Sequence, residues 1–240
     1  MRVIAVCNQK GGTAKTTTAA AIITGAAAKG RRVLGVDADP QGSLTYIMGA
    51  DASRPGVFDW MKGKPPAIQQ TVQGDIIPGS LALATIDKSS SSLQLRAAIE
   101  RLPRYDLVVI DCSPGLGALM MTCLAAAPDG LIPLQAARLS LQGLYQLRQS
   151  IEQVQAALNP SLAVCGVVLT RYNGRSIVSR DMAETIGEKC AALHMPYIKT
   201  PIREGVAVRE AQIVHQSIFD YAPRSNPAQD YKALLDAIKI

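Results

Sequence analysis

Short apolar runs alternate with longer stretches of helical periodicity along the chain. Several runs, such as Leu-Val-Val-Ile at 107–110, are continuous in branched apolar residues, as is typical of parallel strands covered on both faces of a sheet. The runs predict strands at residues 2–7, 33–37, 75–78, 107–111, 130–135, 163–170 and 197–199. The periodic stretches predict helices at residues 15–29, 93–101, 119–126, 139–158, 178–193, 206–215 and 228–238. We expect the serine run 89–92 to cap the second of these helices.

The regular order of strand and helix predicts an α/β fold, a doubly wound and mostly parallel sheet flanked by helices. No internal repeat or low-complexity linker divides the chain, and 240 residues suit one α/β domain. Residues 51–73 are rich in glycine, proline and polar residues, so we interpret them as a surface excursion. Residues 1–240 are therefore expected to form a single domain.

Composition narrows the class of protein. Hydrophobic residues make up 48% and charged residues 18%, which supports a sizeable core and argues against disorder. The net charge of +6 permits an anionic partner, either nucleic acid or an acidic membrane surface. No apolar run approaches the ~20 residues of a membrane span, and the first run is too short for a signal sequence. Five scattered cysteines without a CxxC pair predict reduced thiols in a cytosolic protein.

The loop after the first predicted strand carries the strongest chemical signal. Glycines there allow successive backbone N–H groups to surround phosphate oxygens, and the helix that follows adds its positive N-terminal end. Lys15 is then expected to reach the β- and γ-phosphates, and the Thr16 hydroxyl to bind Mg²⁺. A glycine-rich structural turn is the alternative, but strand, loop and helix follow in the order of a P-loop. The predicted ATP-binding residues are Lys10, Gly11, Gly12, Thr13, Ala14, Lys15, Thr16 and Thr17.

Acidic residues follow two other predicted strands. Asp111 ends the apolar run 107–110, where a carboxylate is expected in the Mg²⁺ shell. Asp37 and Asp39 end the second strand, and the carboxyl ends of parallel strands meet at one edge of the sheet. One of these carboxylates could position the attacking water. Capping of a helix is the alternative role for each of them.

Three motifs together resemble those of ParA-type partition ATPases. Residues 9–17 (QKGGTAKTT), 36–42 (VDADPQG) and 106–114 (DLVVIDCSP) are similar to the deviant Walker A, Walker A′ and Walker B motifs of that family. The similarity continues through residues 132–135, 140–144, 169–175, 209–211 and 221–225, and so covers essentially the whole chain. The length resembles that of the short, Soj-like members, which lack an N-terminal helix-turn-helix domain. We therefore expect a P-loop ATPase domain without that addition.

The resemblance implies roles for individual residues. Lys10 matches the signature lysine that reaches across an ATP-bound sandwich dimer to the partner's phosphates, and a second cation there would neutralise charge that Lys15 alone cannot. Asp39 matches the residue that positions the hydrolytic water. Asp37 and Asp111 match positions in the Mg²⁺ shell, Asp111 through water. Lys10, Lys15 and Asp39 are thus the expected catalytic residues of an ATPase that uses ATP and Mg²⁺.

Ala14 departs from the family pattern, in which glycine usually precedes the loop lysine. A methyl group fits there if the φ angle is negative, whereas a positive φ would strain the loop by on the order of 1 kcal/mol. This departure leaves open a second class of function, a nucleotide-gated DNA-binding switch with negligible hydrolysis.

The resemblance also implies partners. ATP-bound homodimers of this family bind DNA without sequence preference, and hydrolysis, slow alone and stimulated by a ParB-type centromere-binding protein, releases them. We therefore expect a cytoplasmic, nucleoid-associated protein. Candidate DNA contacts are the basic residues of the C-terminal half, Arg175, Arg180, Lys199, Arg203, Arg209 and Arg224.

Two related functions compete with DNA partition. One is the positioning of a non-DNA cargo by the same chemistry. The other is a MinD-like membrane ATPase, whose last helix would be basic and amphipathic. Here Tyr231, Leu234, Leu235 and Ile238 recur at helical spacing with only Lys232 and Lys239 beside them. That pattern favours a helix that packs on the core, and no membrane contact is expected.

Overall fold

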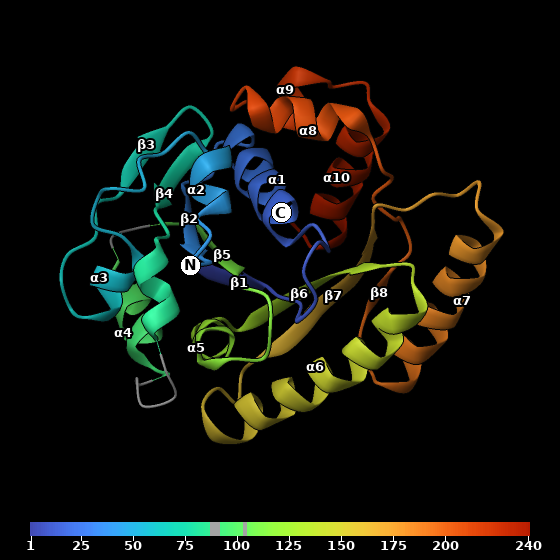
Figure 1. The fold of residues 1–240 in the computed structure, drawn as a ribbon, viewed down its shortest axis with the longest axis horizontal. Helices are drawn as coiled ribbons and strands as arrows, with labels where there is room; N and C mark the ends of the chain where they lie inside the picture. Colours follow the sequence, from blue (N-terminus) through green and yellow to red (C-terminus); the bar gives the residue numbers. More distant parts are fainter. Residues whose placement is uncertain (87–91, 103–104) are drawn as a thin grey trace.

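Eight strands form one sheet within residues 1–86, 92–102 and 105–240, the part of the chain that the computed structural model describes (Figure 1). The strand order is β3-β4-β2-β5-β1-β6-β7-β8, and every pair is parallel except the edge pair β3·β4. This arrangement confirms the predicted doubly wound, mostly parallel sheet. The strands are β1 (Arg2–Val6), β2 (Val33–Ala38), β3 (Gln69–Thr71), β4 (Gly74–Ile77), β5 (Leu107–Cys112), β6 (Asp129–Gln135), β7 (Ala163–Thr170) and β8 (Tyr197–Ile198).

The long helices cover the sheet near the predicted positions. They are α1 (Lys15–Ala28), α4 (Gln94–Glu100), α5 (Ala118–Ala126), α6 (Arg138–Ala157), α7 (Ile177–Ala192), α8 (Val206–Ile213) and α10 (Asn226–Ala237). Sequence periodicity missed four short elements, because each is too brief to show a period: α2 (Ser43–Ile47), α3 (Val57–Met61), the 3₁₀ helix η1 (Leu81–Thr85) and α9 (Ile218–Tyr221). The expected serine cap ahead of α4 falls mainly on residues 89–91, which lie outside the described residues.

Two apolar clusters, one on each face of the sheet, form the core. Alternate residues of β1 enter different clusters, with Val3 and Ala5 on one face and Ile4 and Val6 on the other. This two-sided burial explains the continuous apolar runs of the sequence. Helices α4, α5 and α6 contribute to the first cluster, and α1, α2 and α10 to the second. In Figure 1 the helices accordingly lie on both sides of the sheet.

Helix α10 packs against the core. Tyr231, Leu234, Leu235 and Ile238 are each at most 3% exposed and belong to the cluster that includes α1. The apolar spacing of this helix thus serves packing, as predicted. Within the described residues no helix is both long enough and apolar enough to cross a membrane.

Candidate functional site

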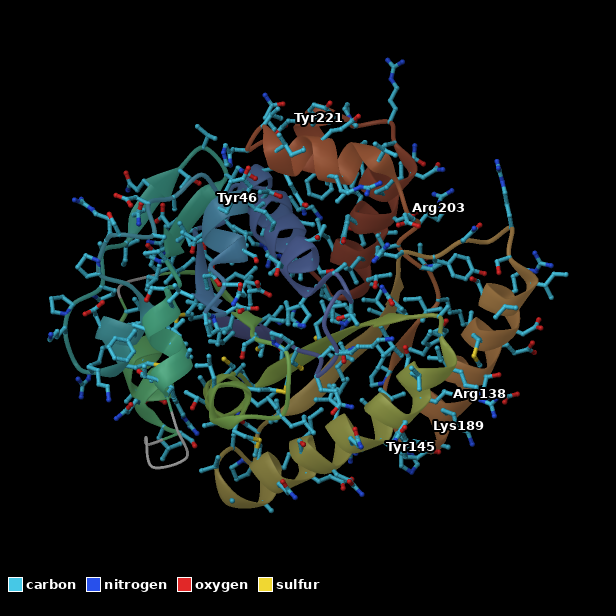
Figure 2. The ribbon with its side chains drawn as sticks, in the orientation of Figure 1. Tyr46, Arg138, Tyr145, Lys189, Arg203 and Tyr221 are labelled. Atoms are coloured by element: carbon cyan, nitrogen blue, oxygen red, sulfur yellow. The ribbon has the colours of Figure 1, made fainter. Side chains whose placement is uncertain are left out.

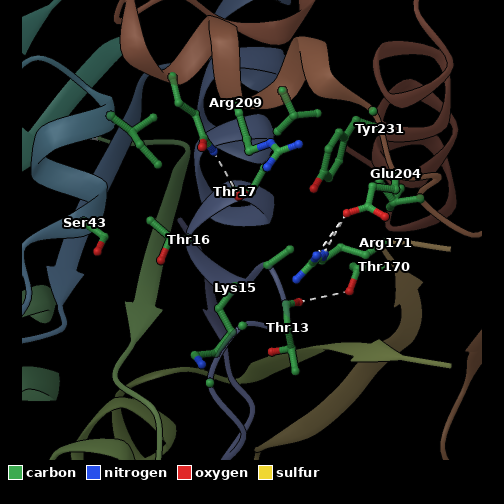
Figure 3. A pocket seen from close by; sticks show the side chains of 18 of the residues that line it. Thr13, Lys15, Thr16, Thr17, Ser43, Thr170, Arg171, Glu204, Arg209 and Tyr231 are labelled. Carbon is green, nitrogen blue, oxygen red and sulfur yellow. Dashed lines mark hydrogen bonds and ion pairs between the residues drawn. The ribbon is translucent and has the colours of Figure 1, made fainter. Parts of the chain in front are cut away.

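A cavity of about 530 Å³ opens at the carboxyl ends of the central strands (Figure 3). The loop between β1 and α1 forms its floor, since residues from Gly11 to Thr17 all line it. Asp39 and Ser43 stand at one side, and the segment that links β8 to α8 forms the opposite wall together with the end of β7. This is the crevice in which open α/β sheets place their ligands.

The backbone of the loop takes up left-handed conformations at two positions. Gly12 has φ 75° and Ala14 has φ 59° with ψ 31°. Ala14 therefore adopts the positive φ that alanine disfavours, and the loop carries strain on the order of 1 kcal/mol. Ala14 is also the N-cap of α1 and supplies no capping side chain. The first N–H groups of α1 can then serve a ligand in the cavity, as helix N-termini do for phosphate.

Side chains from neighbouring strands hold the loop in place. The Gln135 side-chain amide donates to the Gly12 carbonyl at 2.8 Å, and the Thr170 hydroxyl donates to the Thr13 carbonyl at 3.0 Å. Asn8 accepts a hydrogen bond from the Lys10 N–H at 3.0 Å. Sequence reasoning did not assign Gln135 or Thr170 to the site. Their position as the last residues of β6 and β7 is the signal that could have found them.

The two lysines of the loop lie differently. Lys15 is the first residue of α1, lines the cavity and is only 7% exposed. Its Nζ donates to the Lys10 carbonyl at 3.1 Å. Lys10 is half-buried and its side chain lies outside the cavity wall. The structure therefore brings Lys15 to the cavity of its own chain but not Lys10.

Asp37 and Asp111 lie directly opposite each other on the paired strands β2 and β5, and both are fully buried. Asp37 Oδ2 accepts hydrogen bonds from the Thr45 N–H at 2.7 Å and the Thr45 hydroxyl at 2.6 Å, and Oδ1 accepts one from the Asp39 N–H at 3.2 Å. Burial raises the pKa of Asp37 to about 6, although the bonds from Thr45 oppose the rise.

Within the described residues neither carboxylate oxygen of Asp111 has a partner at hydrogen-bond geometry, although both are buried and the Thr16 side chain lies close by. Burial, and then the charge of Asp37, raise the pKa of Asp111 well above its usual value, while Thr16 and Lys15 close by lower it. A buried, unpartnered carboxylate costs free energy unless a cation neutralises it. Hard oxygen donors of this kind suit Mg²⁺, so Asp111 and Thr16 fit a metal shell. The oxygens of Asp37 already accept hydrogen bonds from Thr45 and Asp39, so Asp37 is suited to the outer shell of the metal.

Asp39 lies at the edge of the cavity and is 8% exposed. One of its oxygens, Oδ1, accepts a hydrogen bond from the Gln41 N–H at 3.0 Å. Gly42 follows with φ 64° as the N-cap of α2, whose first residue, Ser43, also lines the cavity. The tight turn thus presents the Asp39 carboxylate to the same space as Lys15 and Thr16.

The basic residues proposed for DNA contact do not share one environment. Arg203, labelled in Figure 2, binds the buried carboxylate of Asp230 at 2.6 and 2.9 Å. Arg209 lines the cavity. The remaining four are exposed and stand outside the cavity wall: Arg175, Arg180, Lys199 and Arg224. Arg171, which the sequence did not single out, lines the cavity and pairs with Glu204 at 3.0 Å.

Known proteins resemble this chain in sequence and structure. A family model described as an AAA domain matches residues 1–164. The chromosome-partitioning ATPase Soj of Thermus thermophilus is 35% identical over 99% of this chain and 95% of its own length. The chromosome partitioning protein ParA of Caulobacter vibrioides is 37% identical over 78% of this chain and 75% of its own.

A solved structure also resembles this chain over its whole length. Cobyrinic acid a,c-diamide synthase from Mycobacterium smegmatis, with a bound ATP analogue and magnesium, superimposes with a TM-score of 0.85 at 32% identity, covering 100% of this chain and 94% of that one. The cavity described above, with its phosphate loop and buried carboxylates, is in keeping with these ligands. The chain therefore belongs to the ParA/Soj family of partition ATPases, enzymes that hydrolyse ATP with Mg²⁺ in the service of DNA segregation.

Proposed function

We propose that residues 1–240 act as one P-loop ATPase domain, which forms a homodimer with ATP sandwiched between its subunits. The observation that supports this is the placement of the two loop lysines. Lys15 lies within the cavity of its own chain, whereas the Lys10 side chain lies outside it. A cation outside one cavity but beside the phosphate loop is suited to complete the cavity of a second subunit.

The residues of one chain divide the chemistry between them. The loop N–H groups and Lys15 bind and orient the phosphates. Thr16 and Asp111 would hold Mg²⁺, with Asp37 in the outer shell, and the metal supplies neutralisation of the phosphate charge when bound. Asp39 orients the attacking water through the oxygen that Gln41 does not occupy. Thr45 keeps Asp37 fixed beside Asp111.

The ATP-bound dimer, in this proposal, binds DNA without sequence preference in the cytoplasm and so associates with the nucleoid. The exposed residues Arg175, Arg180, Lys199 and Arg224 are the candidate contacts that remain without a role in the cavity. A ParB-type partner stimulates slow hydrolysis and so releases the DNA. Phosphate contacts of this kind release counterions, so DNA affinity should fall steeply as the salt concentration rises. A DNA affinity that does not depend on salt concentration would contradict the proposal.

Light scattering after size exclusion tests the dimer. The wild type should be a dimer with ATP and Mg²⁺ and a monomer with ADP. Lys15→Ala should lose ATP binding and therefore dimerisation. Lys10→Ala should still bind ATP, because its side chain lies outside the cavity of its own chain, yet fail to form the sandwich. A wild type that binds ATP but stays monomeric would overturn the proposal.

Asp39→Ala tests the proposed release step. This variant should bind ATP and remain on DNA, because the water is no longer positioned, and its DNA off-rate should become insensitive to the ParB-type partner. The readout is dissociation from immobilised non-specific DNA, with the wild type as control. If Asp39→Ala leaves DNA at the wild-type rate, DNA release does not require hydrolysis and the proposed release step is wrong.

A further inference from the structure

Four cationic side chains line the nucleotide cavity: Lys15, Arg171, Arg203 and Arg209. Three of them have partners of their own. Lys15 donates to the Lys10 carbonyl, Arg171 pairs with Glu204, and Arg203 pairs with Asp230. Among the described residues, no carboxylate lies within ion-pair distance of Arg209. Lys15 has no ion pair either, but its Nζ is held by a backbone carbonyl. Within the part of the chain that the structure describes, Arg209 is therefore the cation of the cavity wall that has neither an ion pair nor a side-chain hydrogen bond.

Helix α8 directs Arg209 into the cavity. Gln212 lies three residues further on and donates from its side-chain amide to the Thr17 hydroxyl at 3.0 Å. Residues three apart lie on the same face of a helix, so Arg209 lies on the face of α8 from which Gln212 contacts α1. Gly205, Val208, Arg209 and Gln212 all line the cavity, at the spacing of one helix face. In Figure 3 the Arg209 side chain accordingly extends from α8 into the space above Thr17.

We propose that Arg209 binds the phosphate chain of the nucleotide in its own subunit and is not part of the DNA surface. A guanidinium group is suited to phosphate, because its planar N–H groups can bind two oxygens at once. The nucleotide would supply the anion that the cavity lacks on this side. The bound nucleotide would then connect α8 to the phosphate loop, in addition to the Gln212–Thr17 hydrogen bond that connects α8 to α1.

This inference goes beyond the proposed dimer and DNA cycle, and its test needs neither. Nucleotide affinity is measured without DNA, by competition of ATP, ADP and adenosine against a fluorescent ATP analogue. The variants are Arg209→Gln and Arg209→Lys, and the matched control is Arg54→Gln, an exposed arginine outside the cavity wall. Because a charge-assisted hydrogen bond to phosphate is lost, Arg209→Gln should bind ATP and ADP about tenfold more weakly.

Three comparisons make the result specific to phosphate. Adenosine affinity should stay at the wild-type value in Arg209→Gln, and Arg209→Lys should recover part of the lost ATP affinity. Arg54→Gln should bind all three ligands as the wild type does. The decisive quantity is the ratio of ATP to adenosine affinity, since a partial loss of folded protein lowers both affinities together and leaves their ratio unchanged.

The proposal is overturned if that ratio in Arg209→Gln lies within about twofold of the wild-type value. It is overturned in favour of a DNA role if nucleotide affinity is unchanged while DNA affinity falls and the salt dependence of DNA binding loses about one phosphate contact. The ADP measurement does not depend on the sandwich dimer, because the protein with ADP is expected to be a monomer, so the two proposals fail separately.

Discussion

Replacing Ala14 with glycine should make the nucleotide-free protein more stable. The Ala14 backbone lies at φ 59° and ψ 31°, a conformation that costs an L-residue roughly 1–2 kcal/mol and glycine almost nothing. Glycine also gains freedom in the unfolded chain, which offsets about 0.4–1 kcal/mol of that benefit. The free energy of unfolding should therefore rise by roughly 0.5–1 kcal/mol, which corresponds to about 1–4 °C in Tm for a chain of this size.

Urea unfolding followed by circular dichroism, without nucleotide and with EDTA, measures this change. Ala97→Gly is the matched control, because Ala97 is an exposed residue inside α4 with ordinary helical backbone. There the same substitution should destabilise by about 1 kcal/mol. The reasoning predicts opposite signs for one chemical change at two positions. If Ala14→Gly also lowers the unfolding midpoint, the left-handed strain at Ala14 is refuted.

Three further predictions concern buried carboxylates. Asp111→Asn should raise the free energy of unfolding in EDTA at pH 7.5 by about 1 kcal/mol, because burial opposes ionisation of this carboxyl group and an amide carries no charge to desolvate. Mg²⁺ with ATP should then stabilise the variant less than the wild type in thermal melts. Since the pKa of Asp37 rises to about 6 on folding, the folded protein binds more protons than the unfolded chain above about pH 4; stability should therefore fall as pH rises from about 4 to 6. Urea titrations should show a smaller fall for Asp37→Asn, and an equal fall would contradict that origin. Arg203→Ala should lower the free energy of unfolding by about 1–2 kcal/mol, because it leaves the buried Asp230 carboxylate without its guanidinium partner. This figure is lower than for a fully buried ion pair, because the arginine side chain is partly exposed to solvent. Arg224→Ala, at an exposed position, should change the unfolding midpoint little by comparison.

The main features of the fold could be predicted because they depend on local pattern. The side chains of a continuous apolar strand are all buried only where both faces of the sheet are covered, as they are at β1 and β5. Gly-Gly followed by Lys-Thr-Thr predicted the phosphate loop, since backbone freedom and helix N-termini act locally. Asp37 and Asp111 were expected at one edge because parallel strands end together, and the structure pairs them residue for residue. Strand β3 was missed, because a polar edge strand of three residues carries no periodic signal.

Tertiary structure decided what each charged side chain touches. Arg203 and Arg209 are equally basic in the sequence and both line the nucleotide cavity, yet only Arg203 of the two has an ion pair among the described residues, with Asp230. Gln135 and Thr170 became supports of the loop only because β6 and β7 bring them to it from more than a hundred residues away. The sequence by itself determined that a phosphate loop follows the first strand. Only long-range packing decided that Ala14 takes a left-handed backbone within it, because a single residue's φ is set by the elements that hold both ends of its loop.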